Sequence, residues 1–316
     1  MLTMIKLKLK TKIPSIKGYN IQKRMKKDIY YKDKINNINP IYVETRDYVY
    51  KPFELDINLE GFTADKILLS NCRCYMIKNN NGDHNLVVYQ IHGGAYALPI
   101  SDNNSKSAVL YSKYIYNCDV FCLDYRVSSQ AVFPAALDDA YEGYMYLLNN
   151  GYNPNNIIIA GHSAGAGLSI ALVMLLRDKK IKLPRCLCLA SPWADLTQKG
   201  QSYTINRNKD VLFGSSRKEA VNESALPTDY SNEFTNPYVS PIYGNFNDLS
   251  PILIQCGSYE MLLSDSIEIE KKIKQANGNV TLNIYKAMWH DFYTKRDDFK
   301  EARIAWKEIS KFVKRA

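Results

Sequence analysis

Beyond a basic N-terminal segment, the chain alternates short apolar runs with stretches whose apolar residues recur every three or four positions. The first pattern predicts β-strands, and the second predicts amphipathic helices. Their alternation is typical of an α/β fold with a mostly parallel sheet. The candidate strands are residues 67–77, 85–92, 119–125, 156–161, 185–191, 251–257 and 280–286. The candidate helices are residues 105–116, 135–149, 163–177, 264–275 and 300–313.

Two further segments lie outside this alternation. In the N-terminal segment, Ile21, Met25 and Ile29 stand four apart, which predicts an amphipathic helix lying over the body of the protein. Residues 198–238 are polar and show no sustained period. A plain connection of this length is unusual in a compact domain, so we expect an insertion with a role of its own, such as part of a lid.

The net charge of +9 belongs to the N-terminal segment alone. Residues 1–40 hold eleven Lys or Arg and two Asp, and the rest of the chain is balanced. The body therefore offers no basic surface for a phosphate backbone, and we expect no nucleic-acid partner. Lysines around a narrow apolar stripe leave open a contact with a membrane surface, but a solvated cap helix is the preferred interpretation.

Cysteine usage and the lack of a long apolar segment bear on the environment of the protein. The seven cysteines lie mostly inside apolar runs, which indicates reduced, buried thiols. Neither closely spaced pair has zinc-site spacing or a nearby histidine, so we expect no metal and no other cofactor. No stretch resembles a secretory signal or reaches the length of a membrane span. We expect a cytoplasmic protein without stable membrane insertion.

A candidate nucleophile stands in residues 161–165, Gly-His-Ser-Ala-Gly, between a predicted strand and a predicted helix. A sharp turn there holds Ser163 above the sheet, and the glycines are needed because Cβ atoms would clash with the neighbouring strand and helix. The N–H groups of Ala164, Gly93 and Gly94 then form an oxyanion hole. The alternative is an ordinary helix start with Ser163 as its N-cap.

A serine nucleophile needs a base, and the chain has four histidines. His84 lies in a polar turn, His92 belongs to the glycine motif, and His162 adjoins the nucleophile. His290 remains, on the loop after the last predicted strand, late in the chain as the Ser, acid, His order requires.

A carboxylate must orient that histidine, and two acidic residues follow the preceding strand. Glu260 lies in the loop directly after the strand, whereas Asp265 stands where a helix begins and suits a first-turn acid. We therefore expect Glu260 to be the acid.

Together these residues resemble the hormone-sensitive lipase branch of the α/β-hydrolase superfamily, from about residue 85 onward. The motifs that carry the resemblance are, in family order, HGGAY (92–96), DYRVSSQAVFPAALDDA (124–140), GHSAGAGL (161–168), SPWADLT (191–197), SPIYGNF (240–246), GSYEMLLSD (257–265) and MWHDFY (288–293). The resemblance implies an α/β-hydrolase fold with a mostly parallel eight-stranded sheet, flanking helices and a helical cap. It divides the chain into an N-terminal cap segment, residues 1–45, and a catalytic domain, residues 46–316, with a cap insertion at about 198–238.

The resemblance also implies roles for single residues, and these agree with the assignments above. Ser163 is the nucleophile, His290 the base and Glu260 the acid, although the family usually has Asp at that position. The expected reaction is hydrolysis of a short-acyl carboxylic ester through an acyl-enzyme. The expected pocket walls are Tyr96, Trp193, Leu212, Phe213 and Trp289.

Other functions on the same fold stay open at this point. The MWH motif (288–290) is similar to that of lactone hydrolases, which makes a cyclic ester the second candidate substrate. The family also includes non-catalytic small-molecule receptors, but such proteins tend to lose a member of the triad. We expect a small-molecule ester as the partner and leave a homodimer open.

Overall fold

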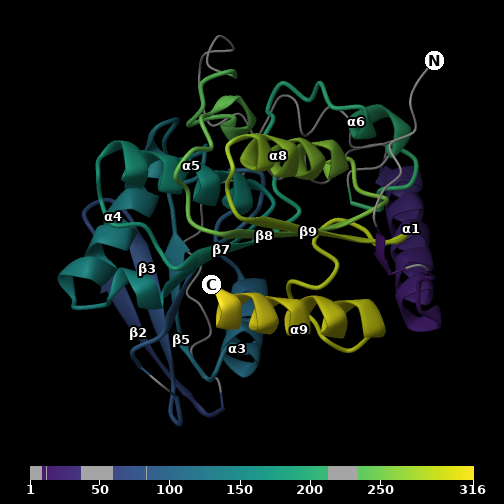
Figure 1. The fold of residues 1–316 in the computed structure, drawn as a ribbon. Coiled ribbons are helices and arrows are strands. Elements are labelled where there is room, and N and C mark those ends of the chain that lie inside the picture. The colour runs from purple at the N-terminus through teal and green to yellow at the C-terminus, as the bar shows by residue number, and fades with distance from the viewer. Residues whose placement is uncertain (1–8, 12, 37–59, 83, 213–233) are drawn as a thin grey trace.

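The computed structural model describes residues 9–11, 13–36, 60–82, 84–212 and 234–316. Within these ranges the chain forms one sheet with helices on both of its faces (Figure 1). The strands are β1 (Leu9–Thr11), β2 (Phe62–Leu68), β3 (Arg73–Asn79), β4 (Val87–Ile91), β5 (Asp119–Asp124), β6 (Ile157–His162), β7 (Cys186–Ala190), β8 (Ile252–Gly257) and β9 (Val280–Tyr285). The α-helices are α1 (Ile16–Asn36), α3 (Asp102–Tyr114), α4 (Ala135–Asn149), α5 (Ala164–Asp178), α6 (Ser202–Ile205), α8 (Leu263–Gln275) and α9 (Lys300–Arg315). Two short 3₁₀ helices are η1 (Pro154–Asn156) and η3 (Pro241–Tyr243).

The order of the strands confirms the mostly parallel α/β architecture. The sheet runs β1-β9-β8-β7-β6-β4-β5-β3-β2. Only the pairs β2–β3 and β3–β5 are antiparallel, and every other pair is parallel. The carboxyl ends of β4, β6, β7, β8 and β9 therefore lie at one edge of the sheet, where an open α/β fold binds ligands.

The strand count differs from the expectation, because the described residues form nine strands and not eight. The run at 67–77 is not one strand. It turns between Leu69 and Cys72, whose N–H and C=O are 2.9 Å apart, and joins β2 to β3 as a hairpin. The additional strand β1 has only three residues, too few to show a period, and its place depends on pairing with β9.

Two hydrophobic cores fill the space on the two faces of the sheet. Helices α4, α5 and α8 cover one face, and α3 and α9 cover the other (Figure 1). Each predicted helix is present, and its ends differ from the prediction by at most three residues. Within the described residues no helix combines the length and the apolar character that crossing a membrane requires.

The N-terminal helix α1 lies against α9, as its amphipathic pattern predicts. Ile21 and Met25 are partly buried and pack against the core beneath α9. Ile29 lies outside the residues whose side chains the structure describes. The helix therefore presents one face to the body, and it starts at residue 16, five residues before Ile21, the first apolar residue of the pattern.

Candidate active site

Ser163 occupies a strained turn between β6 and α5. Its φ is 55° and its ψ is −124°, a region that residues with a side chain rarely adopt. A Cβ atom at Gly161 would meet the Ser169 hydroxyl and the backbone of α5, and one at Gly165 would meet the carbonyl oxygens of residues 91 and 92. The predicted turn with obligatory glycines is therefore present. The Ser163 side chain makes no capping hydrogen bond, so the N-cap alternative does not explain it.

The glycine segment after β4 faces the same turn, but one of its amides is already engaged. The Gly93 N–H donates to His162 Nε2 at 3.0 Å. Gly94 (φ 115°) and Ala95 (φ 55°) both have left-handed backbone, and the turn there is closed by the Ala97 and Leu98 N–H groups, which donate to the Gly94 carbonyl. Ala164 is the first residue of α5, where an amide has no partner within the helix. Gly93 donates to an oxyanion only if its bond to His162 breaks, and Ala95 is a donor candidate that the sequence analysis did not name.

His162 holds that bond as a neutral ring. Burial lowers its pKa to about 3, and the nearby rings of His92 and His290 act in the same direction. Because Nε2 accepts the Gly93 N–H, the proton of the neutral ring is on Nδ1. His162 therefore positions the glycine segment and is not a base for Ser163.

His290 and Glu260, the residues expected to be the base and the acid, lie in contact. Nδ1 of His290 lies 3.3 Å from Oε2 of Glu260, and both side chains are almost fully buried. The other carboxylate oxygen accepts hydrogen bonds from the Ser191 hydroxyl at 2.8 Å and from the Gly257 N–H. Burial raises the pKa of Glu260 well above its ordinary value, and these two donors oppose that shift by stabilising the carboxylate.

The remaining candidates have other partners. His84 lies 2.9 Å from the Asp119 carboxylate, and His92 Nδ1 lies 2.7 Å from the Gly93 carbonyl. Asp265 accepts the N–H groups of Ala194 and Asp195 and the hydroxyl of Tyr203 through one oxygen. Of the four histidines, all within the described residues, it is His290 that contacts the Glu260 carboxylate after β8.

The carboxyl end of β7 joins the loops that carry these residues. The Ser163 N–H donates to the Ala190 carbonyl at 2.9 Å. The next residue, Ser191, donates its hydroxyl to Glu260 and accepts the Asp291 N–H at 3.2 Å. The loops after β6, β8 and β9 are therefore held together by two consecutive residues, and the sequence analysis missed Ser191 although it lies in the quoted SPW motif.

Asp291 is a second residue that the sequence analysis missed. Its Oδ2 lies 3.4 Å from His290 Nε2, and its Oδ1 is buried without a hydrogen-bond partner in the described part of the chain. The backbone is left-handed there, with a φ of 54°. Burial raises the pKa of Asp291 to about 7, against the attraction of His290. The sequence feature that points to Asp291 is its position directly after His290, but a single sequence does not show which way the side chain points.

The predicted pocket walls are divided between the two cores. Tyr96 and Trp193 lie beside the nucleophile turn, with ring centroids 6.2 Å apart. The backbone N–H of Trp193 donates to the Ser163 carbonyl. Leu212 packs against the core on the other face of the sheet, and Phe213 lies outside the described residues. Trp289 is buried in that same core and stacks on Phe299, so its contacts are those of a core residue.

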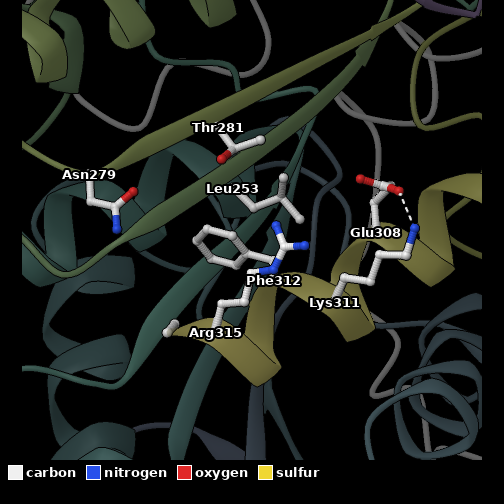
Figure 2. Close-up of a pocket in the computed structure, with 8 residues that line it drawn as sticks. Leu253, Asn279, Thr281, Glu308, Lys311, Phe312 and Arg315 are labelled. Atoms are coloured by element: carbon white, nitrogen blue, oxygen red, sulfur yellow. Dashed lines mark hydrogen bonds and ion pairs between the residues drawn. The ribbon is translucent and has the colours of Figure 1, made fainter.

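A cavity of about 220 Å³ lies at the opposite end of the sheet. Figure 2 shows it between the starts of β8 and β9 and the last turns of α9, with Leu253 and Phe312 at its floor and Glu308 paired with Lys311. Glu260 and His290 follow the other ends of these same strands. This cavity is therefore separate from the candidate active site.

Comparisons with known proteins agree with this geometry. A family model described as an alpha/beta hydrolase fold matches residues 87–294. An acetyl-hydrolase of Streptomyces hygroscopicus is 32% identical over 82% of this chain and 85% of its own length. An esterase of Acinetobacter venetianus is 33% identical over 72% of this chain and 74% of its own. The crystal structure of a hormone-sensitive lipase from a metagenome library is 26% identical and matches 95% of this chain and 98% of its own with a TM-score of 0.80.

The chain belongs to the α/β-hydrolase family, and the resemblance to its hormone-sensitive lipase branch is confirmed. Its class is that of a carboxylic ester hydrolase.

Proposed function

We propose that the protein hydrolyses short-acyl carboxylic esters through an acyl-enzyme formed on Ser163, with His290 as the base and Glu260 as the acid. The strained turn at Ser163, with a side chain that caps nothing, is the observation that carries the proposal. A backbone held in this geometry costs free energy, and such strain is typical of nucleophiles that a fold must present to a substrate.

In the proposed first step, His290 Nε2 takes the proton of the Ser163 hydroxyl while the oxygen attacks the ester carbonyl. Glu260 holds Nδ1 and stabilises the imidazolium that forms. The proton passes to the leaving alcohol, the acyl-enzyme remains, and water activated by the same ring then releases the acid and restores the serine.

The oxyanion of both tetrahedral intermediates accepts hydrogen bonds from the N–H groups of Ala164, of Gly94 and of either Gly93 or Ala95. The bond from Gly93 to His162 favours Ala95, because that bond leaves the Gly93 proton facing the imidazole. Each such donor is worth a factor of about 10² to 10³ in kcat.

A short acyl group suits the surroundings of the serine. The rings of Tyr96 and Trp193 are almost fully buried close to the turn, which leaves little room for a long chain beside them. A relative is named an acetyl-hydrolase, which favours the same substrate class. We also propose that residues 1–45 and about 198–238 form the cap, since Lys26 Nζ of α1 donates to the Asn208 carbonyl at 3.1 Å. A cytoplasmic location and a homodimer stay predictions.

The test compares wild type, Ser163→Ala and Ser169→Ala on p-nitrophenyl esters of increasing chain length and on simple lactones. Ser169 is a matched control because its buried hydroxyl donates to the Gly165 carbonyl inside the same helix. We expect Ser163→Ala to lose about 10⁴-fold or more in kcat and Ser169→Ala to lose little. Equal turnover by wild type and Ser163→Ala would reject the mechanism, and faster turnover of lactones than of acetyl esters would change the substrate class.

A further inference from the structure

The N-terminal helix α1 is fixed to the body by a buried carboxylate. The Ser15 N–H donates to Glu301 Oε1 at 2.6 Å, and the Ser15 hydroxyl donates to Oε2 at 2.5 Å. Glu301 is fully buried in the first turn of α9. A Cβ at Gly18 would lie 3.1 Å from the same carboxylate, so the two helices approach closely there. These contacts determine which face of α1 points inward and which points to solvent.

The outward face of α1, and Ile13 three residues before the helix, expose unusually apolar side chains. Ile13, Ile16 and Tyr19 are 78%, 82% and 52% exposed. At 100° per residue, Ile16, Tyr19 and Lys23 lie on the side of the helix opposite Ile21 and Met25. Because the inward face is packed, burying Ile16 and Tyr19 requires a surface outside the described part of this chain.

Basic residues lie on this face and at its edge. Lys23 lies on the face and Arg24 beside it, both are exposed, and neither forms an ion pair with a described residue. Lys17 lies nearer the inward face and pairs with Asp298 at 2.9 Å. Residues 1–40 carry the entire net charge of +9, while the remainder of the chain is neutral. Apolar side chains bordered by Lys and Arg on one face of a helix match the charge and polarity of an anionic lipid interface. A nucleic acid would pair with the charges but would leave the isoleucines in water.

We propose that this face, formed by Ile13, Ile16, Tyr19, Lys23 and Arg24 and here called the arm face, binds the surface of an anionic membrane. The binding is peripheral, because Ile21 and Met25 remain packed against the body. In Figure 1, α1 stands on the outer flank of the molecule, beyond the strand edge formed by β1 and β9. Each exposed Lys or Arg strengthens such binding about fivefold near an anionic surface.

The test is co-sedimentation of the full chain with large vesicles. One set contains phosphatidylglycerol mixed with phosphatidylcholine, and the other contains phosphatidylcholine alone. We expect binding to the anionic set to be at least tenfold tighter and to weaken as salt is raised, because screening acts on exposed charges. Absence of sedimentation with the anionic vesicles, or equal binding to both sets, would overturn the proposal.

Paired variants separate the arm face from general surface effects. Ile16→Ser/Tyr19→Ser and Lys23→Glu/Arg24→Glu should each weaken anionic binding about tenfold or more. Two controls lie elsewhere: Ile205→Ser removes another exposed isoleucine, and Lys271→Glu/Lys274→Glu gives the same change in net charge on α8.

Both controls should bind like wild type, and the circular dichroism spectrum and thermal midpoint of every variant should match those of wild type, which shows that they are folded. Equal losses in the control variants would overturn the proposal. Displacement of vesicles by duplex DNA, together with normal binding of Ile16→Ser/Tyr19→Ser, would assign the arm face to nucleic acid instead.

Discussion

The turn that carries Ser163 and the loop that carries His290 reach the same edge of the sheet, but different forces hold them. Around Ser163 the contacts are between backbone atoms, and a Cβ at Gly161 or Gly165 has no space. Around His290 the contacts are side-chain hydrogen bonds, in which Glu260 and Ser191 join the loops after β7, β8 and β9.

This difference teaches where stability and chemistry are coupled. Close-packed backbone tolerates no added volume, so a change there lowers stability and activity together. The titratable residue of this turn, His162, has a pKa of about 3 and is therefore neutral near neutral pH. A carboxylate side chain has nearly the same shape as the corresponding amide. Replacing a hydrogen-bonded Glu or Asp by Gln or Asn therefore removes the negative charge and keeps the packing. The histidine loop therefore allows activity to be altered without loss of the fold, and it responds to pH.

The largest expected effect comes from Glu260→Gln. The amide keeps the volume of the buried side chain but no longer stabilises an imidazolium, and its NH₂ group favours the wrong tautomer of His290. We expect kcat to fall about 10⁴-fold, equivalent to about 5.5 kcal/mol, while the thermal midpoint changes by only a few degrees. Steady-state kinetics with p-nitrophenyl acetate and thermal unfolding followed by circular dichroism measure the two quantities.

Asp265→Asn is the matched control for Glu260→Gln. Asp265 is also fully buried beyond β8, but its hydrogen bonds go to the backbone of Ala194 and Asp195. Burial raises its pKa to about 8, so near neutral pH the amide replaces a largely protonated acid. We expect kcat within a few-fold of wild type. A loss as large as that of Glu260→Gln would show that any buried carboxylate in this region is required.

A smaller effect of a different kind is expected for Gly165→Ala in the nucleophile turn. The new methyl group meets the carbonyl oxygens of Ile91 and His92, which are fixed in β4 and the residue after it. We expect a loss of about 3 kcal/mol in the free energy of unfolding together with a loss of activity. Gly18→Ala, also in the first turn of a helix, meets only side-chain atoms at 3.1 Å or more and should cost less than about 1 kcal/mol. Wild-type stability of Gly165→Ala in urea unfolding would contradict the backbone argument.

The same contrast explains what the sequence made predictable. Residues 161–165 encode the turn locally, because the glycines and the strand–helix junction lie within a few positions of Ser163. His290 followed from elimination among four histidines, and Glu260 from its place after a strand. The contact between Nδ1 and Oε2 agrees with both assignments.

Contacts between distant segments were not predictable from periodicity. The bond from Gly93 to His162 joins two loops 69 residues apart, and it changes which amides are available to an oxyanion. Ser191 and Asp291 act through contacts across 69 and 100 residues. Strand β1 is only three residues long, and its edge position depends on pairing with β9 more than 270 residues later. Such contacts arise from the folded arrangement of strands, which a single sequence does not specify residue by residue.

The smallest expected effect concerns Asp291, and it distinguishes the two regions by pH. Burial raises the pKa of Asp291 to about 7, whereas an aspartate in an unfolded chain ionises near 4. Between these values the folded protein binds more protons than the unfolded chain, so this carboxyl lowers stability as pH rises. Its contribution is fully present below about pH 4 and is lost as pH passes about 7. Asp291→Asn, which does not titrate, should become more stable relative to wild type as pH rises across that interval.

Urea unfolding of wild type, Asp291→Asn, Asp297→Asn and Gly165→Ala between about pH 4 and pH 8 measures these slopes. A hydrogen bond from Lys113 lowers the pKa of Asp297, so its favourable contribution is present at neutral pH and is lost as pH falls. Relative to wild type, Asp297→Asn should therefore lose stability only near the acid end of this range, where the unfolded aspartate ionises, a change opposite in sign to that of Asp291→Asn. The deficit of Gly165→Ala should stay constant, because no group near that methyl changes charge. If the stability of Asp291→Asn and that of Gly165→Ala, each relative to wild type, changed with pH in the same way, the histidine loop and the nucleophile turn would not differ in their response to pH.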